Sequence, residues 1–193
     1  FDEPLSNLDA KLRRQVREDI RELQLKLGVT TIYVTHDQEE ALAISDKVIV
    51  MNNAVIAQEG RPKDLYNNPK TTFVANFIGD ANIVKARIET RNENNYDINF
   101  GGIQMKITSN FDLKDSVSIA LRPEKIKITK EKTINCMATK IINSSYVGSC
   151  YQYVVSSNIG ELYIVSNETT NHFKLNEEVF LTFDESEITI LDD

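Results

Sequence analysis

Apolar residues recur at helical spacing near the start of the chain. They stand three or four residues apart, at Leu8, Leu12, Val16, Ile20, Leu23 and Leu27. This spacing places them on one face, so it predicts an amphipathic helix. Ser6 or Asn7 can cap its first turn. Gly28 can end it, because glycine readily adopts the left-handed conformation that closes many helices.

A run of β-branched and apolar residues follows the helix at positions 30–35, and it predicts a buried strand of a parallel sheet. Two further apolar runs, at 47–51 and 54–58, flank Asn52 and Asn53. Asparagine tolerates the positive φ that a two-residue hairpin turn requires. These runs therefore predict a β-hairpin.

Three short helices complete this part of the chain. Residues 37–44 and 73–78 have helical composition, and Pro62 suits the first turn of a third helix. Helices and strands in this order are typical of the second half of an α/β domain. We expect that domain to span residues 1–78.

The pattern changes near Gly79. From about Asn82 onward, short alternating runs are separated by turn residues rich in Asn and Gly. Roughly eight to ten short strands predict a small β-barrel or sandwich. We therefore expect a second, mostly β domain at residues 79–193.

The composition and charge of the chain limit the classes of function that it can have. Hydrophobic residues make up 41% of the chain and charged residues 26%, as in an ordinary globular domain. The net charge of −7 argues against a nucleic-acid partner. No apolar run approaches the roughly 20 residues that cross a bilayer, so membrane association would require another protein. Cys136 and Cys150 form no C-x-x-C motif, and two reduced thiols are the simplest interpretation.

The first four residues, Phe-Asp-Glu-Pro, begin without a cap or an initiator Met, which indicates the end of a strand in a fragment of a longer protein. Asp2 can hold Mg²⁺ beside a nucleotide phosphate, and Glu3 can deprotonate an attacking water. Such a pair is more often a solvated strand end. His36 follows the predicted strand 30–35 and would reach the same sheet edge, although a lone histidine is usually a core residue.

Two motifs that follow one another along the chain favour the functional interpretation of these residues. Residues 1–9, F-D-E-P-L-S-N-L-D, resemble the end of the Walker B strand and the D-loop of an ABC ATPase. Residues 35–41, T-H-D-Q-E-E-A, resemble its H-loop. The resemblance implies the C-terminal half of a P-loop ATPase domain.

The same resemblance implies roles for single residues, with ATP and Mg²⁺ as cofactors. Asp2 would be the Mg²⁺-associated carboxylate and Glu3 the general base. His36 would be the switch residue that contacts the γ-phosphate. Ser6 and Asp9 would lie in the loop that meets nucleotide and the partner ATPase across a dimer.

The resemblance extends along the chain. Residues 51–60 resemble the family hairpin M-x-x-G-x-I-x-Q-x-G, with Ala54 in place of the usual Gly. Residues 121–124, Leu-Arg-Pro-Glu, resemble a short motif of the TOBE (transport-associated OB-like) domain that follows the ATPase domain in some importers. The implied second domain is thus a mostly β, OB-like regulatory barrel.

The resemblance also implies partners. The parent would be a homodimeric ATPase on the cytoplasmic face of the cell membrane, bound to transmembrane permease subunits and served indirectly by a solute-binding protein. The solute would be a polyamine, ferric iron, a phosphonate, a sugar or an inorganic oxyanion, with the first two mildly favoured.

The sequence contains no G-x-x-x-x-G-K-[ST] motif and no LSGGQ-like signature. Without a phosphate-binding loop, this chain is expected to be inactive alone. One alternative is a non-enzymatic module whose β domain binds a small solute or dimerises. Another is a DNA-repair or chromosome-organising ATPase, which the strand-rich residues 82–193 disfavour.

Other polar and aromatic residues favour structural roles. Arg122 to Glu124 fit a turn with an ion pair, and His172 fits a surface loop. Four tyrosines at strand spacing fit core or cross-strand packing better than a ligand cage. They are Tyr146, Tyr151, Tyr153 and Tyr163.

Overall fold

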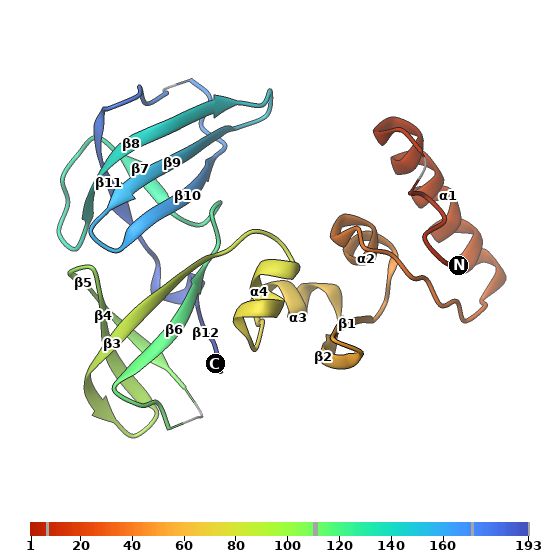
Figure 1. Cartoon of the computed structure of the whole chain (residues 1–193), viewed down its shortest axis with the longest axis horizontal. Coiled ribbons are helices and arrows are strands. Elements are labelled where there is room, and N and C mark those ends of the chain that lie inside the picture. Colours follow the sequence, from red (N-terminus) through yellow and green to blue (C-terminus); the bar gives the residue numbers. More distant parts are fainter. Residues whose placement is uncertain (7, 110–111, 171, 193) are drawn as a thin grey trace. The chain divides into compact units, whose positions relative to one another are not determined.

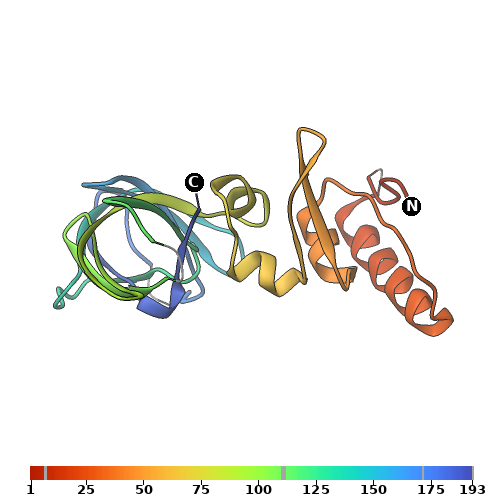
Figure 2. The same cartoon turned by 90° about the horizontal axis from the view of Figure 1, so that it is seen from below.

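The computed structural model describes residues 1–6, 8–109, 112–170 and 172–192. It divides into two compact units (Figure 1, and Figure 2 from below). The first unit comprises Phe1–Pro69 with Phe77–Gly79, and the second Lys70–Asn76 with Asp80–Asp193. None of the helices in the described part of the chain is long and apolar enough to cross a membrane.

The first unit holds the predicted hairpin and all but one of the predicted helices. Its elements are α1 (Ala10–Leu27), α2 (Gln38–Ile44), β1 (Val48–Asn52), β2 (Val55–Gly60) and α3 (Pro62–Asn67). Pro62 stands at the first turn of α3, as predicted. Helix α4 (Thr72–Phe77) lies, except for its last residue, in the second unit.

Helix α1 is capped by a different residue from the two that the sequence suggested. Oδ1 of Asp9 accepts the N–H groups of Lys11 and Leu12, both at 3.0 Å. Ser6 instead lies one turn earlier, and Asn7 falls outside the described residues. Gly28 ends the helix at φ 62°, as predicted.

The predicted buried strand at 30–35 is wrong. Among the described residues, this segment makes a single parallel bridge, between Val34 and Asp2. Ile32 is 78% exposed and Val34 51%. A parallel strand is buried when strands flank it and helices cover both faces. The described first unit pairs this segment only with the first residues of the chain.

Other apolar side chains of the first unit are also exposed. Helix α1 has the predicted apolar face but no buried residue. Large apolar residues with more than a third of their surface exposed lie on α1 and the hairpin; they are Leu12, Leu23, Leu25, Leu27, Ile49, Met51, Val55 and Ile56. Exposed apolar side chains in soluble proteins mark an interaction surface where they form a contiguous patch. The small interior of the unit includes Leu5, Ile44, Val50 and Leu65.

The second unit is the strand-rich part that the sequence predicted. Its strands are β3 (Asn82–Asn92), β4 (Asn95–Phe100), β5 (Ile103–Thr108), β6 (Ser116–Leu121), β7 (Lys127–Thr129), β8 (Met137–Tyr146), β9 (Tyr151–Ser157), β10 (Gly160–Ser166), β11 (Glu178–Thr182) and β12 (Ile188–Ile190), with a 3₁₀ turn at Glu185–Glu187. They form two antiparallel five-stranded sheets, in the orders β10-β9-β8-β11-β7 and β12-β6-β3-β4-β5. The sheets curl around one space (Figure 2), giving the OB-like barrel that was predicted.

One apolar core fills that space with side chains from both sheets. Phe100 and Ile119 enter it from one sheet, and Ile141, Tyr153 and Leu181 from the other. Each of the five is at least nine-tenths buried, so the barrel is closed by packing rather than by backbone pairing alone.

A buried asparagine and a buried arginine tie the barrel together. The side chain of Asn82, on β3, donates to the carbonyls of Leu121 (3.3 Å) and Tyr163 (2.8 Å) and accepts the Tyr163 N–H (2.7 Å). It therefore bridges the two sheets. The Arg122 guanidinium donates to the carbonyls of Ala75 (2.9 Å) and Asp80 (3.0 Å). Arg122 thus has the structural role that was predicted, and the ion pair expected in this turn stays a prediction.

Aromatic rings pack on one another along β8 and β9. Tyr151 stacks on Tyr153 and on His172, each at 5.7 Å between ring centroids, and Tyr146 packs on Tyr151 at 4.9 Å. Tyr153 is buried and His172 is exposed. Tyr146 and Tyr151 thus pack across β8 and β9, and Tyr153 lies in the core, as predicted. Both cysteines are free thiols.

The hairpin turn is displaced by one residue from its predicted place. It is formed by Asn53 and Ala54, whose φ values are 49° and 64°. Asparagine tolerates this left-handed region, but the alanine Cβ lies close to the following carbonyl. The turn thus carries strain at Ala54, where the family hairpin has glycine.

We predict that Ala54→Gly stabilises the hairpin by about 1 kcal/mol, because it removes this contact. Hydrogen exchange of the β1 and β2 amides should slow by about fivefold. Ala57→Gly is the matched control, since Ala57 lies within β2 and has no positive φ. It should speed exchange. Faster exchange in both variants would show that Ala54 is unstrained.

Candidate functional site

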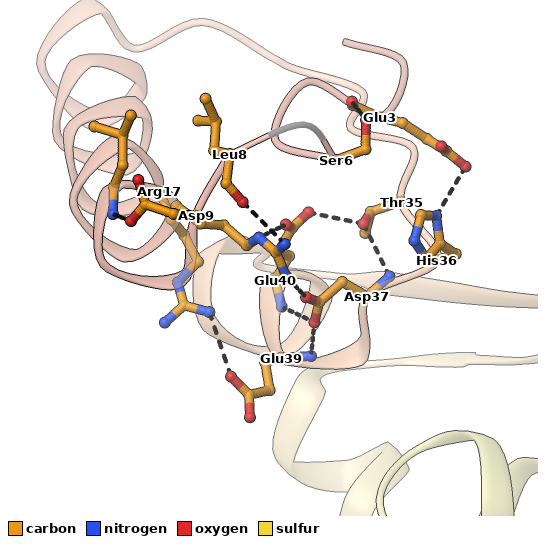
Figure 3. A network of polar contacts seen from close by, with 12 residues as sticks. Glu3, Ser6, Leu8, Asp9, Arg17, Thr35, His36, Asp37, Glu39 and Glu40 are labelled. Atoms are coloured by element: carbon orange, nitrogen blue, oxygen red, sulfur yellow. Dashed lines mark hydrogen bonds and ion pairs between the residues drawn. The ribbon is translucent and has the colours of Figure 1, made fainter.

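Glu3 and His36 meet although 33 positions separate them. The Glu3 N–H donates to the Val34 carbonyl at 2.8 Å, and the Val34 N–H donates to the Phe1 carbonyl at 2.9 Å. These bonds align the two segments, and Glu3 Oε1 then lies 3.0 Å from His36 Nδ1 (Figure 3). A carboxylate only accepts, so the imidazole Nδ1–H is the donor. The Nε2 nitrogen is left for another partner.

The other predicted site residues lie around this pair in different ways. Ser6 Oγ donates to the Glu3 carbonyl at 3.1 Å and supports the turn, in which Glu3 has a φ of 44°. The Asp2 side chain is exposed beside Glu3. Asp9 caps α1, so its carboxylate is already engaged with backbone donors.

The Glu3–His36 pair is open to solvent. Its side chains are 71% exposed for His36 and 48% for Glu3. The hydrogen bond from the imidazole to Glu3 raises the pKa of His36, and the charge of Glu3 adds to this effect. An exposed pair of this kind can respond to a bound anion or to a change of pH.

The carboxylates suit Mg²⁺ in part. Mg²⁺ prefers oxygen ligands and is usually held by one or two carboxylates together with substrate phosphates and water. Within the described ranges, no group of three or more His, Cys, Asp or Glu could hold a metal ion. Asp2 could supply one carboxylate ligand of this kind, with phosphate and water oxygens as the others.

Sequence reasoning missed a buried carboxylate next to the site. Glu40 is 2% exposed, and its Oε2 accepts from Thr35 Oγ1 at 2.7 Å and from the Tyr33 hydroxyl at 3.1 Å. Burial of the Tyr33 hydroxyl raises its pKa, and its hydrogen bond to Glu40 adds to this effect. Acidic residues in the first turn of a helix are common for other reasons, so nothing in the spacing marked Glu40 as buried.

The site is completed by Arg13, which sequence reasoning also missed. Its guanidinium donates to Asp37 Oδ2 and to the Leu8 carbonyl, both at 3.2 Å. Asp37 also caps α2, accepting the N–H groups of Glu39 (2.8 Å) and Glu40 (3.2 Å). The sequence motif around His36 does not indicate that Asp37 pairs with Arg13, because Arg13 lies on α1, 24 residues away.

Comparisons with known proteins agree with both parts of the chain. The model of the TOBE domain matches residues 119–191. The Fe(3+) ions import ATP-binding protein FbpC of Agrobacterium fabrum is 39% identical over 192 residues, covering 100% of this chain and 54% of the relative. The protein of the same name from Photobacterium profundum is 41% identical over 197 residues, covering 99% and 54%.

The chain spans about half the length of these curated relatives. Among solved structures, the cytoplasmic molybdate-binding protein ModG with molybdate bound covers 56% of this chain and 94% of its own. Its TM-score is 0.47 and its identity 9%, so this likeness carries no argument about a ligand.

We predict that Glu3→Gln lowers the pKa of His36, because it removes the charge and the strongest acceptor. The folded-state pKa lies above the ordinary value of about 6.5. The pair therefore stabilises the fold fully below that pH, and this contribution is lost as the pH rises through the raised pKa. An NMR titration measures the shift, with His172→Gln to assign the two histidines.

Glu39→Gln is the matched control for charge, since Glu39 lies three residues from His36 without contacting it. The His36 pKa should change little in this variant. Equal pKa changes in Glu3→Gln and Glu39→Gln would mean that the 3.0 Å contact does not persist in solution.

Proposed function

Because the chain belongs to the family of ATP-binding subunits of ABC import systems that carry a TOBE domain, we propose that the full-length subunit hydrolyses ATP to energise solute uptake. The contact that carries the proposal is the 3.0 Å approach of Glu3 to His36. It joins residues 1–9 and 35–41, the two segments that resemble the Walker B end and the H-loop. Residues 1–78 would then be the C-terminal part of the nucleotide-binding domain.

The exposed Glu3 carboxylate would act as general base toward a water molecule. His36 donates from Nδ1 to Glu3, and once the imidazole is protonated its Nε2–H would donate to the γ-phosphate. Asp2 would hold Mg²⁺, which neutralises phosphate charge when bound. Ser6 and Asp9 would lie on the nucleotide side of the loop that meets a second ATPase subunit.

The partners follow from the same proposal. The subunit would work as a homodimer on the cytoplasmic face of the membrane, bound to permease subunits and supplied by a solute-binding protein. Ferric iron is the solute that the relatives' names favour. Residues 79–193 would form the regulatory domain.

A second function is supported by a hollow of about 430 Å³ on the barrel. Lys85, Arg87 and Asn99 contribute to its lining, together with Ser116 and the carboxylate of Glu89. Charged groups of both signs beside amide and hydroxyl groups suit a small polar solute. The barrel would then be a solute-binding regulatory module rather than only a dimerisation surface.

In the full-length subunit, Glu3→Gln should abolish ATP turnover and leave ATP binding intact, because it removes the base but not the phosphate-binding loop. Steady-state hydrolysis and equilibrium binding measure the two effects separately. A rate within about tenfold of wild type, roughly 1.4 kcal/mol of barrier, would exclude Glu3 as the base.

The 193-residue chain itself should neither hydrolyse ATP nor bind Mg-ATP, because its sequence holds no G-x-x-x-x-G-K-[ST] loop. Isothermal calorimetry at millimolar nucleotide tests this expectation. Saturable, Mg²⁺-dependent heat would show that residues 1–78 bind nucleotide without that loop.

A further inference from the structure

The position of the His36 ring depends on its neighbours in the chain. The imidazole is largely exposed, and its one polar contact with the described residues is Glu3. A side chain with so little packing is oriented by the backbone that carries it. Thr35 and Asp37, on either side of His36, therefore decide where the ring points.

Thr35 and Asp37 are both held by side chains of other segments. Thr35 Oγ1 donates to buried Glu40 at 2.7 Å and accepts the Asp37 N–H at 3.0 Å. Asp37 Oδ2 accepts from Arg13 Nη1 at 3.2 Å. Figure 3 shows the contacts of Thr35 with Glu40 and Asp37 beside the Glu3–His36 pair.

Arg13 connects the loop around His36 to the segment before α1. Its Nη2 donates to the Leu8 carbonyl, in the segment that leads from Glu3 into α1. Its Nη1 donates to Asp37, and its Nε lies 4.0 Å from Glu40 Oε1. One planar guanidinium thus contacts the segments that carry both members of the pair. Lysine cannot replace it, because a single ammonium group lacks this fork of donors.

We propose that Arg13 is a positioning residue that holds His36 against Glu3, by joining the segment before α1 to the loop around His36. Arg13 touches neither member of the pair, so it acts through Leu8 and Asp37. The catalytic consequence rests on the proposed function, whereas the positioning itself does not.

The first experiment uses the 193-residue chain and the ¹⁵N chemical shifts of its His36 ring, at a pH where the imidazole is neutral. Donation to Glu3 fixes the Nδ1–H tautomer in the wild type. Arg13→Gln should shift His36 toward the tautomer mixture of an unrestrained imidazole. Arg13→Lys, which keeps the charge and most of the side-chain volume, should shift it in the same direction.

Arg14→Gln is the matched control, because Arg14 is the next residue of α1 and pairs with Glu18 at the surface. It should leave the tautomer unchanged. Wild-type ring shifts in Arg13→Lys and Arg13→Gln would overturn the proposal. If Arg13→Gln unfolds the first unit, Arg13→Lys alone decides.

The second experiment measures ATP hydrolysis by the full-length subunit. Arg13→Lys should lower kcat by about 10- to 100-fold, the effect of a catalytic group displaced by about 1 Å, with KM for ATP changed less than about twofold. Arg14→Lys should match wild type. Unchanged kcat in Arg13→Lys would refute the catalytic part. A wild-type subunit without turnover would refute the proposed function and leave the tautomer result standing.

Discussion

Two backbone hydrogen bonds between the start of the chain and Val34 set the geometry of the candidate site. They are parallel in sense, and parallel neighbours bring their carboxyl ends to the same edge. Glu3 and His36 each follow the paired residues by one or two positions, so the pairing register alone delivers both side chains to one place. A shift of register by one residue would send the Glu3 side chain to the opposite face.

The ionisable residues around this edge differ in exposure. The Glu3–His36 pair is open to water, where an ion pair contributes little to stability and is free to change partners. Glu40 is buried, and leaving a buried polar partner unsatisfied costs about 1–3 kcal/mol. The buried network around Glu40 therefore lies next to an exposed pair that contributes little stability. The candidate catalytic carboxylate, Glu3, is a different residue from the buried carboxylate, Glu40, whose hydrogen bonds stabilise this part of the fold.

The sequence predicted the elements whose signals are local. The α1 periodicity, the Gly28 stop, Pro62 at a helix start and the short strands of the barrel all depend on a few neighbouring residues. Burial of residues 30–35 was predicted wrongly because it depends on strands and helices elsewhere in a sheet. The Asn82 bridge and the Arg13 contacts were missed for a similar reason. Each joins positions whose proximity only the fold determines.

The two units also differ in how they satisfy their apolar residues. The barrel closes around an apolar core to which both sheets contribute. The hydrogen bonds of the Asn82 side chain satisfy its polar atoms and also join the two sheets. The first unit leaves one face of α1, residues 30–35 and the hairpin exposed. Since burial of apolar surface contributes about 25 cal/mol per Å², another surface that covered these side chains would stabilise the first unit. The exposed apolar side chains of the described chain that such a surface would cover thus lie largely on the unit that carries the candidate catalytic residues.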